Sequence, residues 1–169
     1  RQDCDLTNLD QIKQVIDHHQ PELIINPAAY TKVDQAEDEQ ELAFKINRDA
    51  PKVMAEKARE YHIPLIHFST DYVFDGEKKL GYNENDETNP KGVYGYYTLA
   101  GEQAVRDHPK HIIMRSGWLF GKHKIGLIKS WIHSIKKHKG ELTVWRRRFS
   151  PTSTTDIASA ILAVAQQVD

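Results

Sequence analysis

The chain has 169 residues, of which 39% are hydrophobic and 28% charged, a balance that favours a globular fold with a buried core over disorder. Its single cysteine excludes an internal disulfide, and no apolar run approaches the roughly 20 residues that span a bilayer. The net charge of −1 hides a basic stretch at residues 110–150, which holds eleven Lys and Arg against one acidic residue. We therefore expect a protein without membrane segments, and the reducing cytoplasm is its expected compartment.

The first part of the chain is expected to alternate between strand and helix. Asp3–Leu6 is expected to be the end of a strand, and Thr7 or Asn8 to cap a helix that ends before Pro21. Leu23–Ile25 is a short, fully apolar segment, the kind of strand that is covered on both faces of a sheet.

The middle of the chain continues this alternation. Residues 26–35 are expected to form a loop, and the acidic run Glu37–Glu41 to open a helix, because acidic side chains suit a helix N-terminus. Pro51 marks a kink or a second helix start. The apolar run Leu65–Phe68 predicts the next strand, and residues 75–92, rich in Gly, Asn, Asp, Lys and Pro, predict a surface loop.

The last part of the chain follows the same pattern. The expected elements are a helix from about Tyr94 to Asp107, a strand His111–Met114, a loop Arg115–Lys124, a helix from about Gly126 to Lys137, a strand Glu141–Trp145 and a helix capped by Thr154 or Thr155. Because strands and helices alternate throughout, the sequence predicts an α/β fold with a doubly wound parallel sheet. Such sheets bind nucleotides at the carboxyl ends of their strands.

The most informative segment begins at the strand Leu65–Phe68. The strand runs directly into the polar side chains of Ser69, Thr70 and Asp71, as expected where the carboxyl end of a parallel strand holds a site. Tyr94 then opens a helix, which would place a phenol beside those hydroxyls. A phenol in such a place is a plausible proton donor for carbonyl chemistry. The alternatives are that Tyr94 is a buried aromatic residue and that Thr70 and Asp71 form an ordinary turn or helix cap.

Two features weigh against full activity. A catalytic tyrosine of this kind normally has a lysine four residues on, where this chain has Thr98, which keeps a hydroxyl but lacks the charge that would lower the pKa of the phenol. In addition, no glycine precedes Gly76, so the glycine-rich turn that approaches a pyrophosphate is absent. Either the chain binds no dinucleotide or it starts downstream of that turn, and its first residue, Arg1, favours the second interpretation.

The distribution of charged residues and of histidines indicates which classes of ligand the chain is expected to bind. A basic stretch in an otherwise acidic chain would attract an anion such as a diphosphate, although a solvated helix face with a basic loop explains it equally well. Nucleic acid is a weaker expectation, because aromatic residues for base stacking are not interleaved with the charges. The nine histidines lack metal-ligand spacing, so no metal site is expected among them.

Several motifs occur together in an order that resembles the dTDP-4-dehydrorhamnose reductase family, a branch of the extended short-chain dehydrogenase/reductases. The likeness covers essentially the whole chain and is carried by the segments Asp5–Asn8, Asn26–Asp34, Ser69–Gly76, Tyr94–Gly95, Leu99–Glu102, Arg115–Gly121 and Ser150–Thr152. The family reduces the 4-keto group of a dTDP-linked 6-deoxyhexulose to give dTDP-L-rhamnose, using NADPH or NADH. The resemblance implies an N-terminally truncated Rossmann-like region at residues 1–115, without its first βαβ portion, and part of a sugar-nucleotide-binding lobe at residues 116–169.

The resemblance also assigns roles to particular residues. Tyr94 would donate the proton, with Thr70 and Thr98 as the other catalytic positions, and Thr70, Asp71 and Trp118 would face the sugar nucleotide. The cofactor-binding residues would be Asp5, Leu6, Ala28, Ala29, Tyr30, Thr31, Ser69 and Tyr94. Relatives can dimerise with a magnesium ion, so a homodimer holding Mg²⁺ is a further expectation, although nothing in the sequence marks its ligands.

Three alternatives to this assignment remain open. Trp118 would lie in the hydrophobic core if it does not face a ligand. A non-catalytic relative that serves as a nucleotide-binding or subunit-interaction module would explain Thr98 as a genuine loss. A nucleotide-sugar epimerase or dehydratase would need further acid–base groups near Asp71, which the sequence does not provide. Arg146–Arg148 depart from the acidic or amide pair usual in the family before its Pro-Thr, which suggests altered phosphate or dimer contacts.

Overall fold

The structure is a computed structural model that describes residues 3–122, 127–137 and 150–168. The chain divides into two compact units, Arg1–Arg115 with Val168–Asp169, and Ser116–Gln167. The expected strand Glu141–Trp145 and the arginines Arg146–Arg148 lie outside the described residues.

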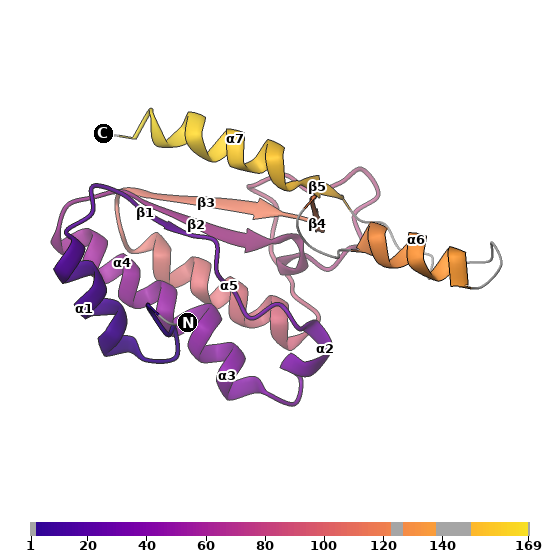
Figure 1. Ribbon diagram of the computed structural model, residues 1–169, viewed down its shortest axis with the longest axis horizontal. Coiled ribbons are helices and arrows are strands. Elements are labelled where there is room, and N and C mark those ends of the chain that lie inside the picture. The colour runs from indigo at the N-terminus through magenta and orange to yellow at the C-terminus, as the bar shows by residue number, and fades with distance from the viewer. Residues whose placement is uncertain (1–2, 123–126, 138–149, 169) are drawn as a thin grey trace. The chain divides into compact units, whose positions relative to one another are not determined.

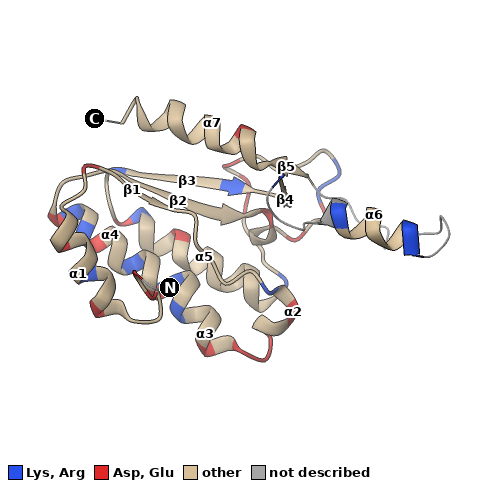
Figure 2. Cartoon of the chain, viewed as in Figure 1, with Lys and Arg blue, Asp and Glu red and all other residues tan. Residues whose placement is uncertain are grey.

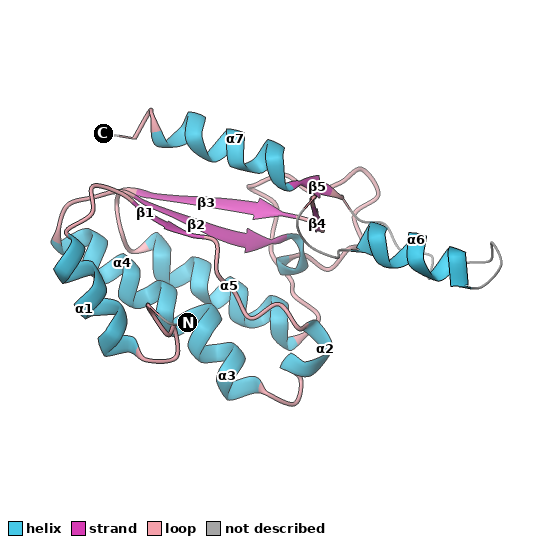
Figure 3. Ribbon diagram, viewed as in Figure 1, coloured by secondary structure: helices cyan, strands magenta, loops and turns pink. Residues whose placement is uncertain are grey.

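The first unit is built on a sheet of three strands in the order β1-β2-β3, with bounds Ile24–Asn26, Leu65–Thr70 and His111–Ser116. β1 and β2 are parallel, and Asn26 is the register partner of His67. All three arrows point the same way in Figure 3. Helices connect each strand to the next, so the expected α/β class with a parallel sheet is confirmed.

The helices of this unit lie on one face of its sheet (Figure 1). They are α1 Leu9–His19, α2 Val33–Ala36, α3 Gln40–Phe44, the π-helix η1 Lys45–Asp49, α4 Ala50–Glu60 and α5 Val93–Arg106. The side chain of Asn8 caps α1 by accepting a hydrogen bond from Gln11 N–H at 3.1 Å. α1 ends at Gln20, whose φ of 42° is left-handed, directly before Pro21.

The start of the chain differs from the prediction. Asp3–Leu6 forms no strand: the carboxylate of Asp5 accepts hydrogen bonds from the Thr7 backbone N–H at 2.9 Å and from the Thr7 hydroxyl at 2.8 Å. This local bonding turns the chain into α1, because an Asp side chain can mimic a backbone turn. The short helix α2, expected to be loop, is a single turn, which is too short for a hydrophobic period to reveal.

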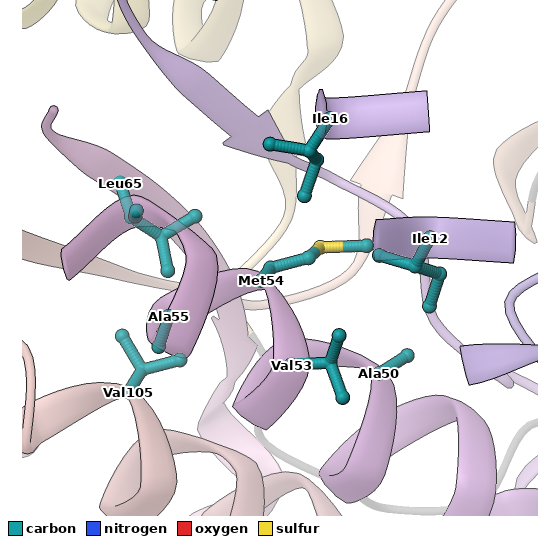
Figure 4. Packing of buried hydrophobic residues seen from close by; sticks show 9 residues of the cluster. Ile12, Ile16, Ala50, Val53, Met54, Ala55, Leu65 and Val105 are labelled. Carbon is teal, nitrogen blue, oxygen red and sulfur yellow. The ribbon is translucent and has the colours of Figure 1, made fainter. Parts of the chain in front are cut away.

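The main hydrophobic core lies between the sheet and helices α1, α4 and α5, as Figure 4 shows at close range. Its buried members are Ile12, Ile16, Ala50, Val53, Met54, Ala55, Ala58, Leu65 and Val105. A second cluster gathers around Tyr30, Ala36, Ala43 and Ile46, with Leu6 and Tyr94 packed against it. Leu6 also packs against the main core, so it joins the two clusters.

Two glycines let α5 approach its neighbours closely. A Cβ atom on Gly95 would lie 2.3 Å from the main-chain oxygen of Tyr72, and one on Gly101 would lie 2.1 Å from that of Asn47. No side chain fits at these distances, so only glycine permits this packing. α5 is therefore held by backbone contacts at the end of β2 and at the π-helix.

The expected surface loop at residues 75–92 is organised around one carboxylate. Asp75 accepts hydrogen bonds from the Tyr82 hydroxyl, from Glu77 N–H at 3.0 Å and from Asn89 Nδ2 at 3.1 Å. The hydrogen bond from Tyr82, supported by the other two, lowers the pKa of Asp75 to about 2. The ring of Phe74 stacks on that of Tyr82 with 4.3 Å between centroids, which further fixes the loop.

The second unit contains β4 Leu119–Phe120, α6 Leu127–Lys137, β5 Thr152–Ser153 and α7 Thr154–Ala165. β4 and β5 pair in parallel, so a short strand stands where a loop was expected. The cap of α7 is Ser153, whose hydroxyl accepts from Asp156 N–H at 3.4 Å, and not Thr154 or Thr155. Figure 2 shows Lys and Arg, in blue, on α6, whereas the helices of the first unit carry both blue and red segments.

A candidate carbonyl-reduction site

The candidate site begins where β2 ends. Thr70, the last residue of the strand, is followed by the short 3₁₀ helix η2, Asp71–Val73. The Thr70 hydroxyl accepts from Tyr72 N–H at 3.2 Å and donates to Asp71 Oδ1 at 3.3 Å. Burial raises the pKa of the Asp71 carboxyl, against hydrogen bonds that lower it. The turn therefore presents a hydroxyl and a carboxylate at the carboxyl edge of the sheet.

Tyr94 lies beside this turn, in the first turn of α5. Its ring meets that of Tyr72 edge to face, with 5.5 Å between centroids and 77° between planes. Burial raises the pKa of the Tyr94 phenol, the neighbouring Thr70 hydroxyl opposes this, and the charges of Asp71 and Tyr72 add to it. The structure thus brings Tyr94, Thr70 and Asp71 together, as their spacing predicted.

Position 98 supplies no charge to this arrangement. The buried Thr98 hydroxyl donates to the main-chain carbonyl of Tyr94 at 2.8 Å, one helical turn back, and accepts from Asn47 Nδ2 at 3.4 Å. It is therefore bonded to the helix backbone. Among the described residues, no basic side chain contributes to the shifted pKa of the Tyr94 phenol, so the neutral form is favoured.

Asn47 is a site residue that the sequence interpretation missed. It lies in the π-helix η1, a local widening that often marks functional positions. Its Oδ1 accepts from the backbone N–H of Tyr30 at 2.7 Å, and its Nδ2 donates to the Tyr30 carbonyl at 3.1 Å. An asparagine between the apolar Ala43, Ile46 and Ala50 was the available signal. Asn47 links the loop after β1 to Thr98, which lies one helical turn after Tyr94.

The loop after β1 carries half of the expected cofactor positions. Ala28, Ala29 and Thr31 are exposed, whereas Tyr30 is buried. The Tyr30 hydroxyl donates to Glu39 Oε2 at 2.5 Å, and this hydrogen bond raises the pKa of Tyr30 to about 12. Small exposed side chains on a loop whose backbone is fixed would allow a flat ligand to lie close to the main chain, which is what a dinucleotide needs.

Ser69 faces the interior. Its hydroxyl donates to Glu102 of α5, which is fully buried. Arg115 of β3 donates to the same carboxylate through Nε at 2.8 Å and Nη2 at 2.7 Å, which raises the pKa of the guanidinium. Glu102 was another omission of the sequence interpretation. It ties β2, α5 and β3 together directly below the candidate site.

The remaining expected site residues are spread more widely. Asp5 shapes the turn before α1, and Leu6 shares the second hydrophobic cluster with Tyr30 and Tyr94. Trp118 belongs to the second unit, where its carbonyl accepts from Thr152 N–H at 2.9 Å, and its place beside a sugar nucleotide stays a prediction.

Among the described residues, no group of three or more His, Cys, Asp or Glu could hold a metal ion. Within the same residues, no helix is both long and apolar enough to cross a membrane.

A parallel sheet with polar groups at its carboxyl edge, and a tyrosine beside a threonine hydroxyl, define a Rossmann-like protein of the short-chain reductase type. Residues 1–169 match the family described as RmlD substrate binding domain. The chain is 38% identical over 170 residues to a dTDP-4-dehydrorhamnose reductase of Sinorhizobium fredii, covering 99% of this chain and 57% of that protein. It is 37% identical over 167 residues to the reductase of the same name from Aggregatibacter actinomycetemcomitans, covering 98% and 57%.

Solved structures agree with these sequences. A dTDP-4-dehydrorhamnose reductase of Clostridium acetobutylicum superposes with a TM-score of 0.93 at 39% identity, over 98% of this chain and 59% of that one. A dTDP-4-dehydrorhamnose reductase of Bacillus anthracis in complex with NADP superposes with a TM-score of 0.88 at 36% identity. The match covers 96% of this chain and 58% of that one. The chain belongs to the dTDP-4-dehydrorhamnose reductase family, and it spans somewhat more than half the length of these relatives.

Proposed function

We propose that this chain is part of an NAD(P)H-dependent sugar-nucleotide reductase that converts dTDP-4-dehydrorhamnose to dTDP-L-rhamnose. The observation that carries the proposal is the place of the Tyr94 phenol, whose ring meets that of Tyr72 edge to face in the turn that holds Thr70 and Asp71, at the carboxyl edge of the sheet. The names of the relatives supply the substrate and the reaction, and the NADP complex of one relative supplies the cofactor class.

The exposed Ala28 and Ala29, on a loop that Asn47 fixes, fit a dinucleotide at this edge. Bound NADPH or NADH would supply the hydride to the carbonyl carbon of the sugar. Negative charge then develops on the carbonyl oxygen, where Tyr94 would deliver its proton. The Thr70 hydroxyl, which donates to Asp71 in the structure, would turn its proton to the same oxygen. Tyr94 is protonated at neutral pH, because burial raises the pKa of its phenol, so it is ready to act as the acid.

Transfer of the proton leaves a negatively charged phenolate on Tyr94, and this chain stabilises that charge poorly. A lysine at position 98 would stabilise that charge, whereas the Thr98 hydroxyl is bonded to the Tyr94 carbonyl and Asp71 adds a negative charge nearby. We therefore expect slow turnover. This same observation favours a second candidate function, a non-catalytic module that binds a nucleotide or a partner subunit.

Substitution at position 98 separates these two functions. In a protein that carries these residues and spans the length of the relatives, Thr98→Lys should raise turnover of the 4-keto sugar about ten-fold or more. Thr98→Met has a similar length without charge, and it should leave turnover low. NADPH binding without turnover in either the parent or Thr98→Lys would reject the reductase and favour the module.

Removal of the acid tests the role of Tyr94. We expect Tyr94→Phe to lower turnover by about 100-fold, the usual scale for a lost general acid. Tyr96→Phe is the matched control, because Tyr96 lies on the same helix and is 62% exposed. Equal turnover in the parent and Tyr94→Phe would show that another group donates the proton.

The preferred nicotinamide nucleotide and the oligomeric state stay predictions. Titration of the protein into NADPH or NADH, followed by the fluorescence of the nucleotide, would show which of the two cofactors binds more tightly. A homodimer is testable by light scattering. The described residues offer no magnesium cluster, so a metal-bridged dimer is not part of this proposal.

A further inference from the structure

The carboxyl end of β1 and the middle of β2 carry a buried pair of polar side chains that the mechanism above does not use. Asn26 ends β1 and is 3% exposed, and its register partner on β2, His67, is 2% exposed. Asn26 Nδ2 lies 3.1 Å from His67 Nδ1. A polar pair inside an apolar α/β core is costly unless its bonding serves the fold or the site.

The hydrogen bonds around the pair fix which atom donates. Ala28 N–H donates to Asn26 Oδ1 at 3.2 Å, so the amide group of Asn26 turns its Nδ2 toward the imidazole. Because Nδ2 only donates, His67 Nδ1 accepts, and the proton of the neutral ring resides on Nε2. Burial lowers the pKa of His67 to about 4, against a smaller opposing effect of Glu102, so the ring is neutral over the physiological range.

This pair and Asn47 hold the same loop at two points. Asn26 binds the N–H of Ala28, and Asn47 binds both the N–H and the carbonyl of Tyr30. The residues between them, from Ala28 to Tyr30, include the small exposed positions to which the proposed function assigns the dinucleotide. The backbone of the loop is thus fixed by two buried amides, one of which takes its orientation from His67.

We propose that His67 is a positioning residue for the dinucleotide: by accepting from Asn26, it directs the Asn26 carbonyl oxygen to Ala28 N–H and so holds the loop in its binding conformation. This inference rests on the proposed function. If position 67 lacked an acceptor, Nδ2 of Asn26 would be buried without a partner. Rotation of the amide would then place that donor against the Ala28 N–H, and the loop would lose its first anchor.

Two substitutions of equal shape test the role of the acceptor. His67→Asn places an amide oxygen near the position of Nδ1, whereas His67→Leu has the same branching without an acceptor. In a protein of the relatives' length, we expect His67→Leu to weaken NADPH binding about five-fold, with kcat at saturating NADPH within about two-fold, on the scale of one lost hydrogen bond. His67→Asn should retain most of the parental affinity. Equal affinity in the two variants would overturn the proposal.

His108 provides the matched control. It is also 2% exposed, its Nε2 lies 2.9 Å from the carbonyl oxygen of Ile63, and its Nδ1, like Nε2 of His67, has no hydrogen-bond partner among the described residues. Ile63 precedes β2, at the opposite end of that strand from the loop. His108→Leu should lower stability but leave NADPH affinity unchanged. A five-fold loss of affinity in this variant would show that the effect of position 67 is merely structural.

Amide exchange separates this proposal from the proposed function. His67→Leu should speed exchange of the Ala28 N–H at least five-fold, while the Tyr30 N–H, held by Asn47, keeps its parental rate. Asn26→Ala removes the same anchor from the loop side, and it should give the same result if His67→Leu does not fold. Failure of the parent to bind NADPH would reject the proposed function and the dinucleotide as the ligand of this loop, whereas the Ala28 exchange rate would still decide whether His67 holds the loop. Unchanged Ala28 exchange, or faster exchange with unchanged NADPH affinity, would overturn the role of His67.

Discussion

Removal of the Arg115 side chain offers the sharpest test of what holds the site together. The substitution Arg115→Met keeps much of the aliphatic length and deletes the guanidinium. In the native structure, that group makes two hydrogen bonds, of 2.8 Å and 2.7 Å, to a Glu102 carboxylate that is 0% exposed. After the substitution, the partners that the carboxylate keeps among the described residues are the Ser69 hydroxyl and, at 3.9 Å, the guanidinium of Arg106.

The expected magnitude follows from this geometry. Breaking a buried ion pair by removing one partner typically costs about 3–5 kcal/mol, because it leaves an uncompensated charge in the interior. The whole stability of a domain is about 5–15 kcal/mol, so Arg115→Met should bring the first unit near its unfolding threshold. Arg106 provides a control on the same carboxylate. Its side chain is 52% exposed, so Arg106→Met should cost less than about 1 kcal/mol.

Urea unfolding followed by circular dichroism measures both variants under one protocol. We expect the midpoint to fall strongly for Arg115→Met and slightly for Arg106→Met, with similar slopes. The double variant Arg115→Met/Glu102→Leu should recover part of the loss, because it removes the stranded charge. Equal costs for the two arginines would refute the argument, since it depends on burial and bidentate geometry and not on charge alone.

Two further predictions concern backbone packing and pH. Gly101→Ala should destabilise the protein by about 1–3 kcal/mol or more, since its Cβ would lie 2.1 Å from a main-chain oxygen. In the control Gly92→Ala, the Cβ would lie 3.2 Å from the flexible Glu37 carboxylate, and the cost should be less than about 1 kcal/mol. Thermal unfolding compares the two variants, and equal costs would contradict the close approach at Gly101. The folded-state pKa of Asp75 is about 2, below its ordinary 3.8, so its contribution to folding stability is present above pH 3.8 and is lost as the pH falls toward 2. Asp75→Asn should reduce the change in stability with pH over that window. A pKa near 3.8, measured for Asp75 by NMR titration, would refute this prediction.

The order of elements could be predicted from periodicity, but their ends could not. β2 extends through Ser69 and Thr70, because their backbone groups continue the strand beyond the apolar run Leu65–Phe68. The π-helix at Lys45–Asp49 also escaped prediction, since Pro51 suggested a helix start and the chain instead continues from α3 into α4 through the widened turn. Hydrophobic patterns report which face is buried, and they do not report where a polar strand end or a wide helical turn lies.

The grouping of the site was partly predictable. Thr70 and Tyr94 come together because one ends a parallel strand and the other opens the next helix, a placement that topology alone dictates. Asn47, His67 and Glu102 were not found, because the residues that satisfy their side chains lie far away in sequence. The role of each of these residues depends on a buried hydrogen bond that no local pattern records.

The close contacts of Gly95 and Gly101 have a consequence for how this site can change over evolution. Main chain meets main chain at both points, so the position of α5 relative to the end of β2 and to the π-helix does not depend on the size of any side chain. Other side chains at this edge of the sheet can therefore vary without displacing the phenol of Tyr94. In the proposed reductase, such a scaffold would allow the choice of sugar to diverge while the distance between Tyr94 and the loop after β1 stays constant, provided the two glycines remain.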